Sequence, residues 1–328
     1  MLSRVADSVY WMSRYVERAE NLARFIQVNF NLMLDAPPGV PPQWAPLIST
    51  TGDDAVFAER YAEPSEANVI HFLTFDEENP NAILSSLRAA RENARSVREI
   101  ISSEMWEQLN TTYLFVRAAA AEARTRARPQ EFYTRVKEAG HLFCGITDAT
   151  LTHNEAWHFI RLGRMLERAD KTSRNLDVKY FLLLRSAADV GTPFDEIQWA
   201  AVLRATSAFE MYRKKHGRIA PSAIVEFLLL NDEFPRAILH CLNRARASLQ
   251  SISGTPPGSP GNLGERLLGQ LCSDLTYTSV EEVIQAGLHE YLDDLQTRLN
   301  RVGTAVHSTF FALRVPEAAG ASRHGRLA

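Results

Sequence analysis

The chain has 328 residues, of which 45% are hydrophobic, and its 36 basic and 39 acidic side chains leave a net charge of −3. This composition excludes wholesale disorder, and the near balance of charge gives no overall field for nucleic acid or an anionic membrane. Three separated cysteines form neither a CxxC pair nor a disulfide framework, and no apolar run suits a signal peptide or a membrane span. We therefore expect a soluble cytoplasmic protein.

Apolar residues recur every three or four positions along almost the whole chain, and the alternation typical of strands is nearly absent. The first predicted helix starts near Leu2 and stops at the proline-rich stretch 36–42, where fixed φ angles and missing N–H groups end a helix. Shorter helices fill 53–75, and Asn79-Pro80 predicts an N-cap with proline at the first helical position. Further helices are predicted at 80–101, 103–127, 130–146, 154–188, 194–215, 221–230, 234–252 and 279–312.

Two further patterns mark helix starts, namely Thr192-Pro193 and the capping box Ser279-x-x-Glu282. Residues 254–261, rich in glycine and proline, form the clearest loop. Composition does not change on either side of this loop or of the proline-rich stretch. We therefore expect an all-α multi-helix bundle that forms one domain over 1–312, followed by a flexible tail at 313–328.

Two helical segments 150 residues apart carry nearly the same charged residues. Residues 14–20 read Arg-Tyr-Val-Glu-Arg-Ala-Glu, and residues 164–170 read Arg-Met-Leu-Glu-Arg-Ala-Asp. Arg24 and Arg174 follow the two segments at the same distance. This recurrence predicts a pseudo-repeat that relates the N-terminal and middle parts of the bundle.

The repeated charges have two interpretations. On each helix they fall on the face opposite the apolar stripe, and a third such face runs along 88–99, so they could form solvated faces with i,i+3 and i,i+4 pairs. Alternatively, several faces converge on a cleft, where arginines bind a carboxylate or phosphate and glutamates hold them in place. The recurrence keeps the second interpretation open, because a solvated face does not require fixed identities. Its candidate binding residues are Arg14, Glu17, Arg88, Glu92, Arg164, Glu167 and Arg168.

Three polar residues interrupt apolar arcs. Glu155 and His158 point into the arc of 154–188, and Glu210 lies within that of 194–215. A carboxylate on a buried face must be paired, protonated or bound to a metal, because burial of an isolated charge is too costly. Glu155 lies near a helix start, where solvent or the helix dipole could explain it. Glu155 and Glu210 are nevertheless the candidate catalytic residues, and pairing of Glu210 with an arginine is the structural alternative.

Glu155 and His158 have the Glu-x-x-His spacing of carboxylate-bridged di-iron bundles, and Glu138 and His141 repeat this spacing. A di-iron bundle needs these motifs on separate long helices together with two further glutamates, whereas here they are seventeen residues apart. We predict no metal ligands. The sequence lacks the GxSxG, Walker, Rossmann and HExxH motifs, and it specifies no cofactor.

Several segments together resemble the bacterial alpha-E domain family. They are residues 3–21, 85–95, 104–107, 152–159 with the Arg164 segment, 207–210 and 234–236, and the likeness extends over about 1–312. The resemblance implies an all-helical protein with recurring glutamates, which here are Glu17, Glu92, Glu104, Glu155, Glu167 and Glu210. It also implies an association with circularly permuted ATP-grasp proteins, sometimes by fusion, and with transglutaminase-like peptidases.

Three hypotheses for function follow. In the first, the protein is an accessory or substrate-binding partner of an ATP-grasp-type ligase in peptide or amide-bond metabolism, and its Arg/Glu faces bind a carboxylate, acyl phosphate or peptide terminus. In the second, it is an enzyme that uses Glu155 or Glu210 as a general base, or as a metal ligand with His158. In the third, it is a helical scaffold whose charge pairs are structural. The sequence leaves the oligomeric state open.

Overall fold

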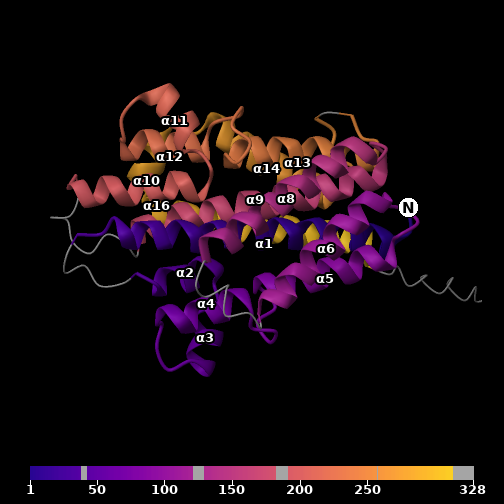
Figure 1. Ribbon diagram of the computed structural model, residues 1–328. Coiled ribbons are helices and arrows are strands. Elements are labelled where there is room, and N and C mark those ends of the chain that lie inside the picture. Colours follow the sequence, from indigo (N-terminus) through magenta and orange to yellow (C-terminus); the bar gives the residue numbers. More distant parts are fainter. Residues whose placement is uncertain (38–42, 121–128, 182–190, 257, 313–328) are drawn as a thin grey trace, which may run out of the picture.

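The computed structural model describes residues 1–37, 43–120, 129–181, 191–256 and 258–312, and every regular element in these ranges is helical, as predicted (Figure 1). No helix in these ranges is both long and apolar enough to cross a membrane. The predicted tail and parts of the predicted helices 103–127 and 154–188 lie outside the described residues.

The helices form two series with the same packing order. The first series is α1 (Ser3–Leu34), α2 (Ala45–Thr51), α3 (Asp54–Arg60), α4 (Glu66–Thr74), α5 (Ile83–Ser96), α6 (Ser103–Ala119) and α8 (Pro129–Thr150). The second series is α9 (Glu155–Phe181), α10 (Pro193–Ala205), α11 (Phe209–His216), α12 (Pro221–Leu229), α13 (Ile238–Ser253), α14 (Leu263–Tyr277), α15 (Val280–Ala286) and α16 (Leu288–Val306), which continues into a π-helical turn, His307–Phe311.

The pseudo-repeat extends over both series. In the first, α5 and α8 pack against α1, and α6 packs against both of them. In the second, α13 and α16 pack against α9, and α14 packs against both of them. The central helices α1 and α9 pack against each other; α2, which follows α1, packs on α9, whereas α10, which follows α9, packs on α1. Figure 1 shows α2–α4 and α10–α12 on opposite sides of α1.

The central helices run in the same direction and approach each other closely at two equivalent positions, Ser13 and Gly163. The Ser13 hydroxyl lies 2.9 Å from the Tyr10 carbonyl oxygen and 2.7 Å from the Ile160 carbonyl oxygen, and Tyr10 and Ile160 are themselves related by the repeat. A Cβ atom on Gly163 would lie 2.4 Å from the Tyr10 carbonyl oxygen. Small side chains at this crossing therefore allow the backbones of α1 and α9 to approach.

Both predicted caps of the second series are confirmed. Thr192 accepts a hydrogen bond from the Asp195 N–H, and Ser279 and Glu282 form the full capping box. The predicted cap at Asn79 is wrong, because α5 begins at Ile83. The Asn79 side-chain oxygen instead accepts the backbone N–H of Asn81 in the preceding turn.

Two long predicted helices are broken, and two helices were not predicted. The stretch 194–215 divides at Ser207, whose φ of 52° is left-handed, and 279–312 divides at Gly287, whose φ is 91°. The additional helices are the short α2 and the longer α14, which begins after the Asn262 N-cap. The two glycines of α14, Gly264 and Gly269, weaken the helical pattern in the sequence.

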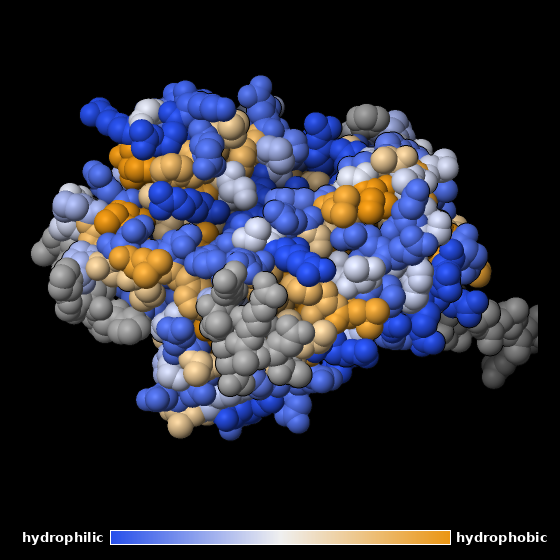
Figure 2. Space-filling model, viewed as in Figure 1, coloured by the Kyte–Doolittle hydropathy of each residue, from blue (hydrophilic) through white to orange (hydrophobic). Residues whose placement is uncertain are grey.

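Hydrophilic side chains cover most of the face seen in Figure 2, with separate hydrophobic patches between them. This is the surface expected of amphipathic outer helices. The central helix α1 differs, because its charged face is buried as well as its apolar stripe. Glu17 is 3% exposed and Arg24 is 2% exposed. The solvated-face interpretation is therefore wrong for α1, and the buried charges lead to the candidate site.

Candidate functional site

The two Glu-Arg pairs of the repeat exchange partners between α1 and α9. Arg168 donates from Nε and Nη2 to the two carboxylate oxygens of Glu17, and both distances are 2.8 Å. Arg18 donates in the same way to Glu167, at 2.7 Å from Nε and 3.2 Å from Nη2. Each carboxylate therefore binds the arginine that follows its counterpart in the other helix.

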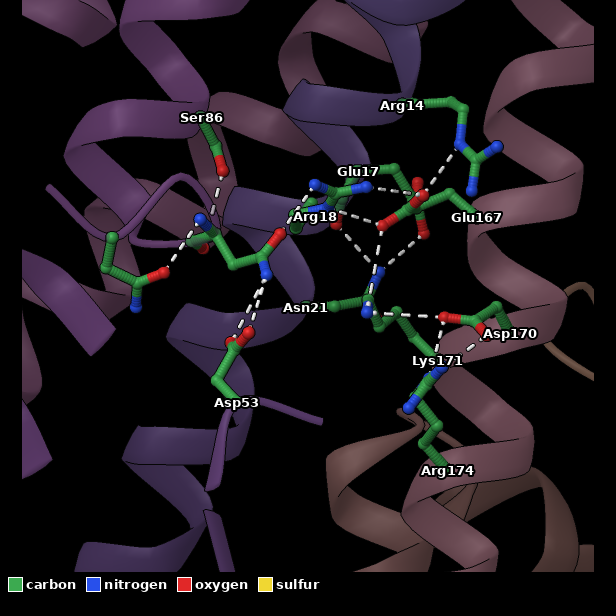
Figure 3. A network of polar contacts seen from close by, with 12 residues as sticks. Arg14, Glu17, Arg18, Asn21, Asp53, Ser86, Glu167, Asp170, Lys171 and Arg174 are labelled. Atoms are coloured by element: carbon green, nitrogen blue, oxygen red, sulfur yellow. Dashed lines mark hydrogen bonds and ion pairs between the residues drawn. The ribbon is translucent and has the colours of Figure 1, made fainter. Parts of the chain in front are cut away.

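The Glu167 centre is the group of side chains around the Glu167 carboxylate, and Figure 3 shows it between the two helices. Arg14 Nε donates to Glu167 at 2.8 Å, and Lys171 Nζ lies 3.8 Å from the same carboxylate. One turn further along α9, Asp170 accepts from Arg174 at 3.0 Å and pairs with Lys171 at 3.3 Å. Arginine and lysine side chains thus surround both carboxylates.

The Glu17 centre is the corresponding group around the Glu17 carboxylate. Besides Arg168, Arg236 Nη1 donates to Glu17 at 3.1 Å, and Asn21 donates at 2.9 Å. Arg236 Nη2 also donates to Glu20 at 3.0 Å, and Glu20 forms an ion pair with Arg24. The pair Glu20–Arg24 is the repeat equivalent of Asp170–Arg174.

A second sequence recurrence explains the main difference between the centres. Residues 80–84 read Pro-Asn-Ala-Ile-Leu, and residues 235–239 read Pro-Arg-Ala-Ile-Leu, each at the start of the helix that packs on its central helix. Asn81 accepts from Arg18 at 2.8 Å, whereas its equivalent Arg236 donates to Glu17. Neither Asn81 nor Arg236 was predicted as a site residue, although this recurrence is the signal that could have identified them.

The ionisation of the buried carboxylates follows from these contacts. Burial alone would raise the pKa of Glu17, but Arg168 and Arg236 outweigh it and hold the pKa below its usual range. Burial would likewise raise the pKa of Glu167, and Arg18, Arg14 and Lys171 hold that pKa well below the usual value. Both carboxylates are therefore ionised at neutral pH, with cations in excess around them.

Two of the basic groups around Glu17 and Glu20 also have lowered pKa values, which disfavours their charged forms. Burial, together with the charge of Arg168, lowers the pKa of Arg236 to about 10. Burial, Arg24 and Arg236 lower the pKa of His141 to about 4, so this histidine is neutral at pH 7 and lies 3.1 Å from Glu20. Positive charge is thus crowded in the Glu17 centre.

A pocket of about 430 Å³ adjoins the Glu167 centre between α1, α9 and α16. Arg14 lies in its wall, held by Glu167 and by a 3.0 Å hydrogen bond from Nη1 to the Tyr10 hydroxyl. The guanidinium also lies 4.9 Å from the centre of the Trp11 ring. The remaining lining residues are Leu166, Asp170, Leu299, Asn300, Gly303, Thr304, His307 and Phe311. This pocket, which we call the Arg14 pocket, combines apolar walls with a fixed guanidinium.

The seven predicted binding residues do not all lie together. Four of them, namely Arg14, Glu17, Glu167 and Arg168, form ion pairs between α1 and α9. Arg164 is buried on α9, and its Nη2 lies 3.7 Å from Asp148 on α8. The other two, Arg88 and Glu92, lie on α5. Arg88 pairs with Glu77 and is 43% exposed, and Glu92 pairs with neighbouring arginines and is 45% exposed. The apolar face of α5 packs on α1, so its charged face is solvated, and convergence on one cleft is wrong for these two.

Both catalytic candidates are exposed, which contradicts the burial expected for Glu210 and agrees with the solvent explanation given for Glu155. Glu210 is exposed, because the chain breaks at Ser207 and α11 starts in a new register. Glu155 is exposed at the first turn of α9, where its carboxylate lies 2.8 Å from the Met1 amine. His158 is half-buried. Among the described residues, no group of three or more His, Cys, Asp or Glu side chains could hold a metal ion.

Comparison with known proteins gives relatives of undefined activity. The chain is 25% identical to Uncharacterized protein Mb2597 of Mycobacterium bovis and to Uncharacterized protein Rv2567 of Mycobacterium tuberculosis. Each match covers 94% of this chain but only 37% of the relative, so the chain spans little more than a third of their length. No solved structure matches the chain.

Residues 1–311 match the Alpha-E family, which is described as a predicted alpha-helical domain with a conserved ER motif. The Glu-Arg pairs 17–18 and 167–168 that cross between α1 and α9 are two such dipeptides. The chain belongs to the Alpha-E family.

Proposed function

We propose that the protein is a helical binding module that holds a carboxylate, an acyl phosphate or a peptide terminus in the Arg14 pocket. The observation that carries this proposal is the fixed position of the Arg14 guanidinium in the pocket wall. Its hydrogen bonds to Glu167 and Tyr10 use Nε and one Nη1 hydrogen. A guanidinium has five N–H groups, so donors are left for an oxyanion in the pocket.

The rest of the pocket supports a ligand that is anionic at one end and apolar at the other. Trp11, Leu166 and Phe311 provide apolar surface, and Asn300 and Thr304 provide neutral polar groups. The volume of about 430 Å³ falls in the range of small-molecule sites, roughly 300–1,000 Å³. A carboxylate with an apolar body, such as a peptide C-terminus, fits this chemistry.

We further propose that the module works beside an ATP-grasp-type ligase. The family resemblance implies an association with ATP-grasp proteins, and an ATP-grasp ligase activates a carboxylate as an acyl phosphate. The relatives are much longer than this chain, so in them the helical unit is joined to other sequence. A module that holds the carboxylate substrate would serve such a ligase as an accessory subunit or domain.

The binding test compares N-acetylphenylalanine with its amide by ligand-observed NMR on the full chain. We expect the acid to bind and the amide to bind much more weakly, because only the acid pairs with Arg14. The Arg14→Gln variant should no longer bind N-acetylphenylalanine. The Arg88→Gln variant, which changes the solvated face of α5, should bind it as the wild type does. Thr304→Trp is a second blocking variant, because it fills the pocket without removing a member of the Glu167 centre. Equal binding of acid and amide, or binding that survives both pocket variants, would contradict the proposal.

For the partner test, an ATP-grasp protein from the same organism is co-expressed with this chain. We expect the two proteins to copurify and the ligase activity to fall with Arg14→Gln. If they do not copurify and the activity does not depend on this chain, the partnership is wrong even where the pocket binds its ligand.

A further inference from the structure

The repeat equivalent of Arg14 is Arg164, and its surroundings differ in one respect. Arg14 Nε donates to Glu167, whereas Arg164 Nε is buried and has no hydrogen-bond partner. Arg164 is 9% exposed, and its one ion-pair contact is Nη2 at 3.7 Å from Asp148. A buried guanidinium N–H that lacks an acceptor is unfavourable, so this arrangement calls for an additional ligand.

Arg164 lacks the hydrogen bond that Arg14 makes because the Glu17 carboxylate is already bound by other arginines. Arg168 takes both of its oxygens, and Arg236 approaches one of them at 3.1 Å. In the Glu167 centre the position of Arg236 is held by Asn81, which leaves room on the carboxylate for Arg14. The presence of Arg236 therefore excludes Arg164 from Glu17.

Arg161 is the nearest cation to Arg164 along α9, one turn earlier, and its guanidinium lies 5.1 Å from the centre of the Trp157 ring. Burial, followed by the charges of Arg244 on α13 and of Arg164, lowers the pKa of Arg161. The nearby carboxylate, Asp148 on α8, is 49% exposed and already accepts a 3.1 Å hydrogen bond from the Trp157 indole. Arg161 and Arg164 thus lie near one half-exposed carboxylate, and the charge of Arg244 acts on Arg161.

We propose that Arg161, Arg164 and Arg244 form a second anion site on the α8–α9–α13 side of the molecule, and that its ligand is a phosphoryl group. A dianion with several acceptor oxygens can bridge guanidinium groups that repel one another, and it can accept hydrogen bonds from Arg164 at Nη2, where the contact with Asp148 is 3.7 Å long. Asp148 is half exposed, so the incoming group can take its place beside Arg164. Internal duplication has then produced two sites, a carboxylate pocket at Arg14 and a phosphoryl site at Arg164.

The test is isothermal titration of the full chain with inorganic phosphate at pH 7.5 and constant ionic strength. We expect saturable binding that weakens by about tenfold or more in Arg161→Gln and in Arg164→Gln, since each loses charge-assisted hydrogen bonds. Arg161 is only half-buried, so its variant keeps the test valid where Arg164→Gln impairs folding. Arg95→Gln is the control, because Arg95 is 66% exposed and lies outside both sites, and this variant should bind phosphate as the wild type does.

Three results would overturn the proposal: no phosphate binding, unchanged binding in folded Arg161→Gln, or an equal loss in Arg95→Gln. The two sites are distinguished by their variants, because Arg14→Gln and Thr304→Trp test the Arg14 pocket, whereas Arg161→Gln and Arg164→Gln test the Arg164 cluster.

Discussion

The Glu17 carboxylate is bound through both of its oxygens by the Arg168 guanidinium, 151 residues away along the chain. Glu17→Gln would leave Arg168 and Arg236 buried without their main counter-charge. We expect the free energy of unfolding, measured with urea at pH 7, to fall by about 3–5 kcal/mol. Glu92→Gln makes the same substitution at an exposed glutamate, and it should change the free energy of unfolding by no more than about 0.5 kcal/mol. Similar losses in the two variants would show that the crossed pair does not stabilise the α1–α9 interface.

A second prediction concerns the acid range and Glu167. Its folded-state pKa is held well below the usual 4.5, because Arg18, Arg14 and Lys171 outweigh the effect of burial. A carboxylate with a depressed folded pKa contributes stability that is fully present above the unfolded pKa and is lost as pH falls through the folded pKa. The difference in unfolding free energy between wild type and Glu167→Gln should therefore be constant from pH 7 to about 5 and shrink below about 4.5. Denaturation curves at half-unit pH steps test this, and a difference that persists unchanged at pH 3 would rule it out.

A third prediction concerns His141 and the stability of the protein over a higher pH range. Burial, Arg24 and Arg236 lower its folded pKa to about 4 from the usual 6.5, so the folded protein favours the neutral ring. Its contribution to stability is therefore present above pH 6.5 and is lost as pH falls toward 4. Relative to wild type, His141→Gln should lose less stability between pH 6.5 and 4.5, which lies above the range in which Glu167 titrates. Parallel pH curves for the two proteins would disprove this.

The sequence predicted the helical class, the long first helix, the caps at Thr192 and Ser279, and the repeat of Arg14–Glu20 in the middle of the chain. These features depend on local periodicity and local hydrogen bonds, which a sequence displays directly. Helix breaks were harder to predict, because the apolar spacing continues through Ser207 and only the backbone there turns left-handed.

The site was predicted in part. The sequence identified Arg14, Glu17, Glu167 and Arg168, but it could not show that two polar helix faces are buried against each other. That burial is tolerable only because each face supplies the other's counter-charges, and this depends on tertiary pairing. Glu210 was expected in a buried apolar arc because the spacing continues through Ser207, and the helix break there places its side chain in solvent.

The last prediction tests the close approach that brings the two centres together. An alanine at Gly163 would place its Cβ 2.4 Å from the Tyr10 carbonyl oxygen and 2.7 Å from the Ser13 hydroxyl. The first of these is backbone, so α1 and α9 must move apart. Alanine has a higher helix propensity than glycine, but the steric clash outweighs this gain. We expect a net loss of about 1–3 kcal/mol in the free energy of unfolding.

The matched control for Gly163→Ala is Gly145→Ala. Gly145 is also inside a helix, α8, but an added Cβ there meets nothing within 4 Å. That substitution should stabilise the protein by about 0.5–1 kcal/mol. Since separation of α1 from α9 would also lengthen the Arg14–Glu167 contact, Gly163→Ala should weaken binding of N-acetylphenylalanine while Gly145→Ala leaves it unchanged. If the two alanine variants had the same stability, the two central helices would not depend on their close packing at Ser13 and Gly163.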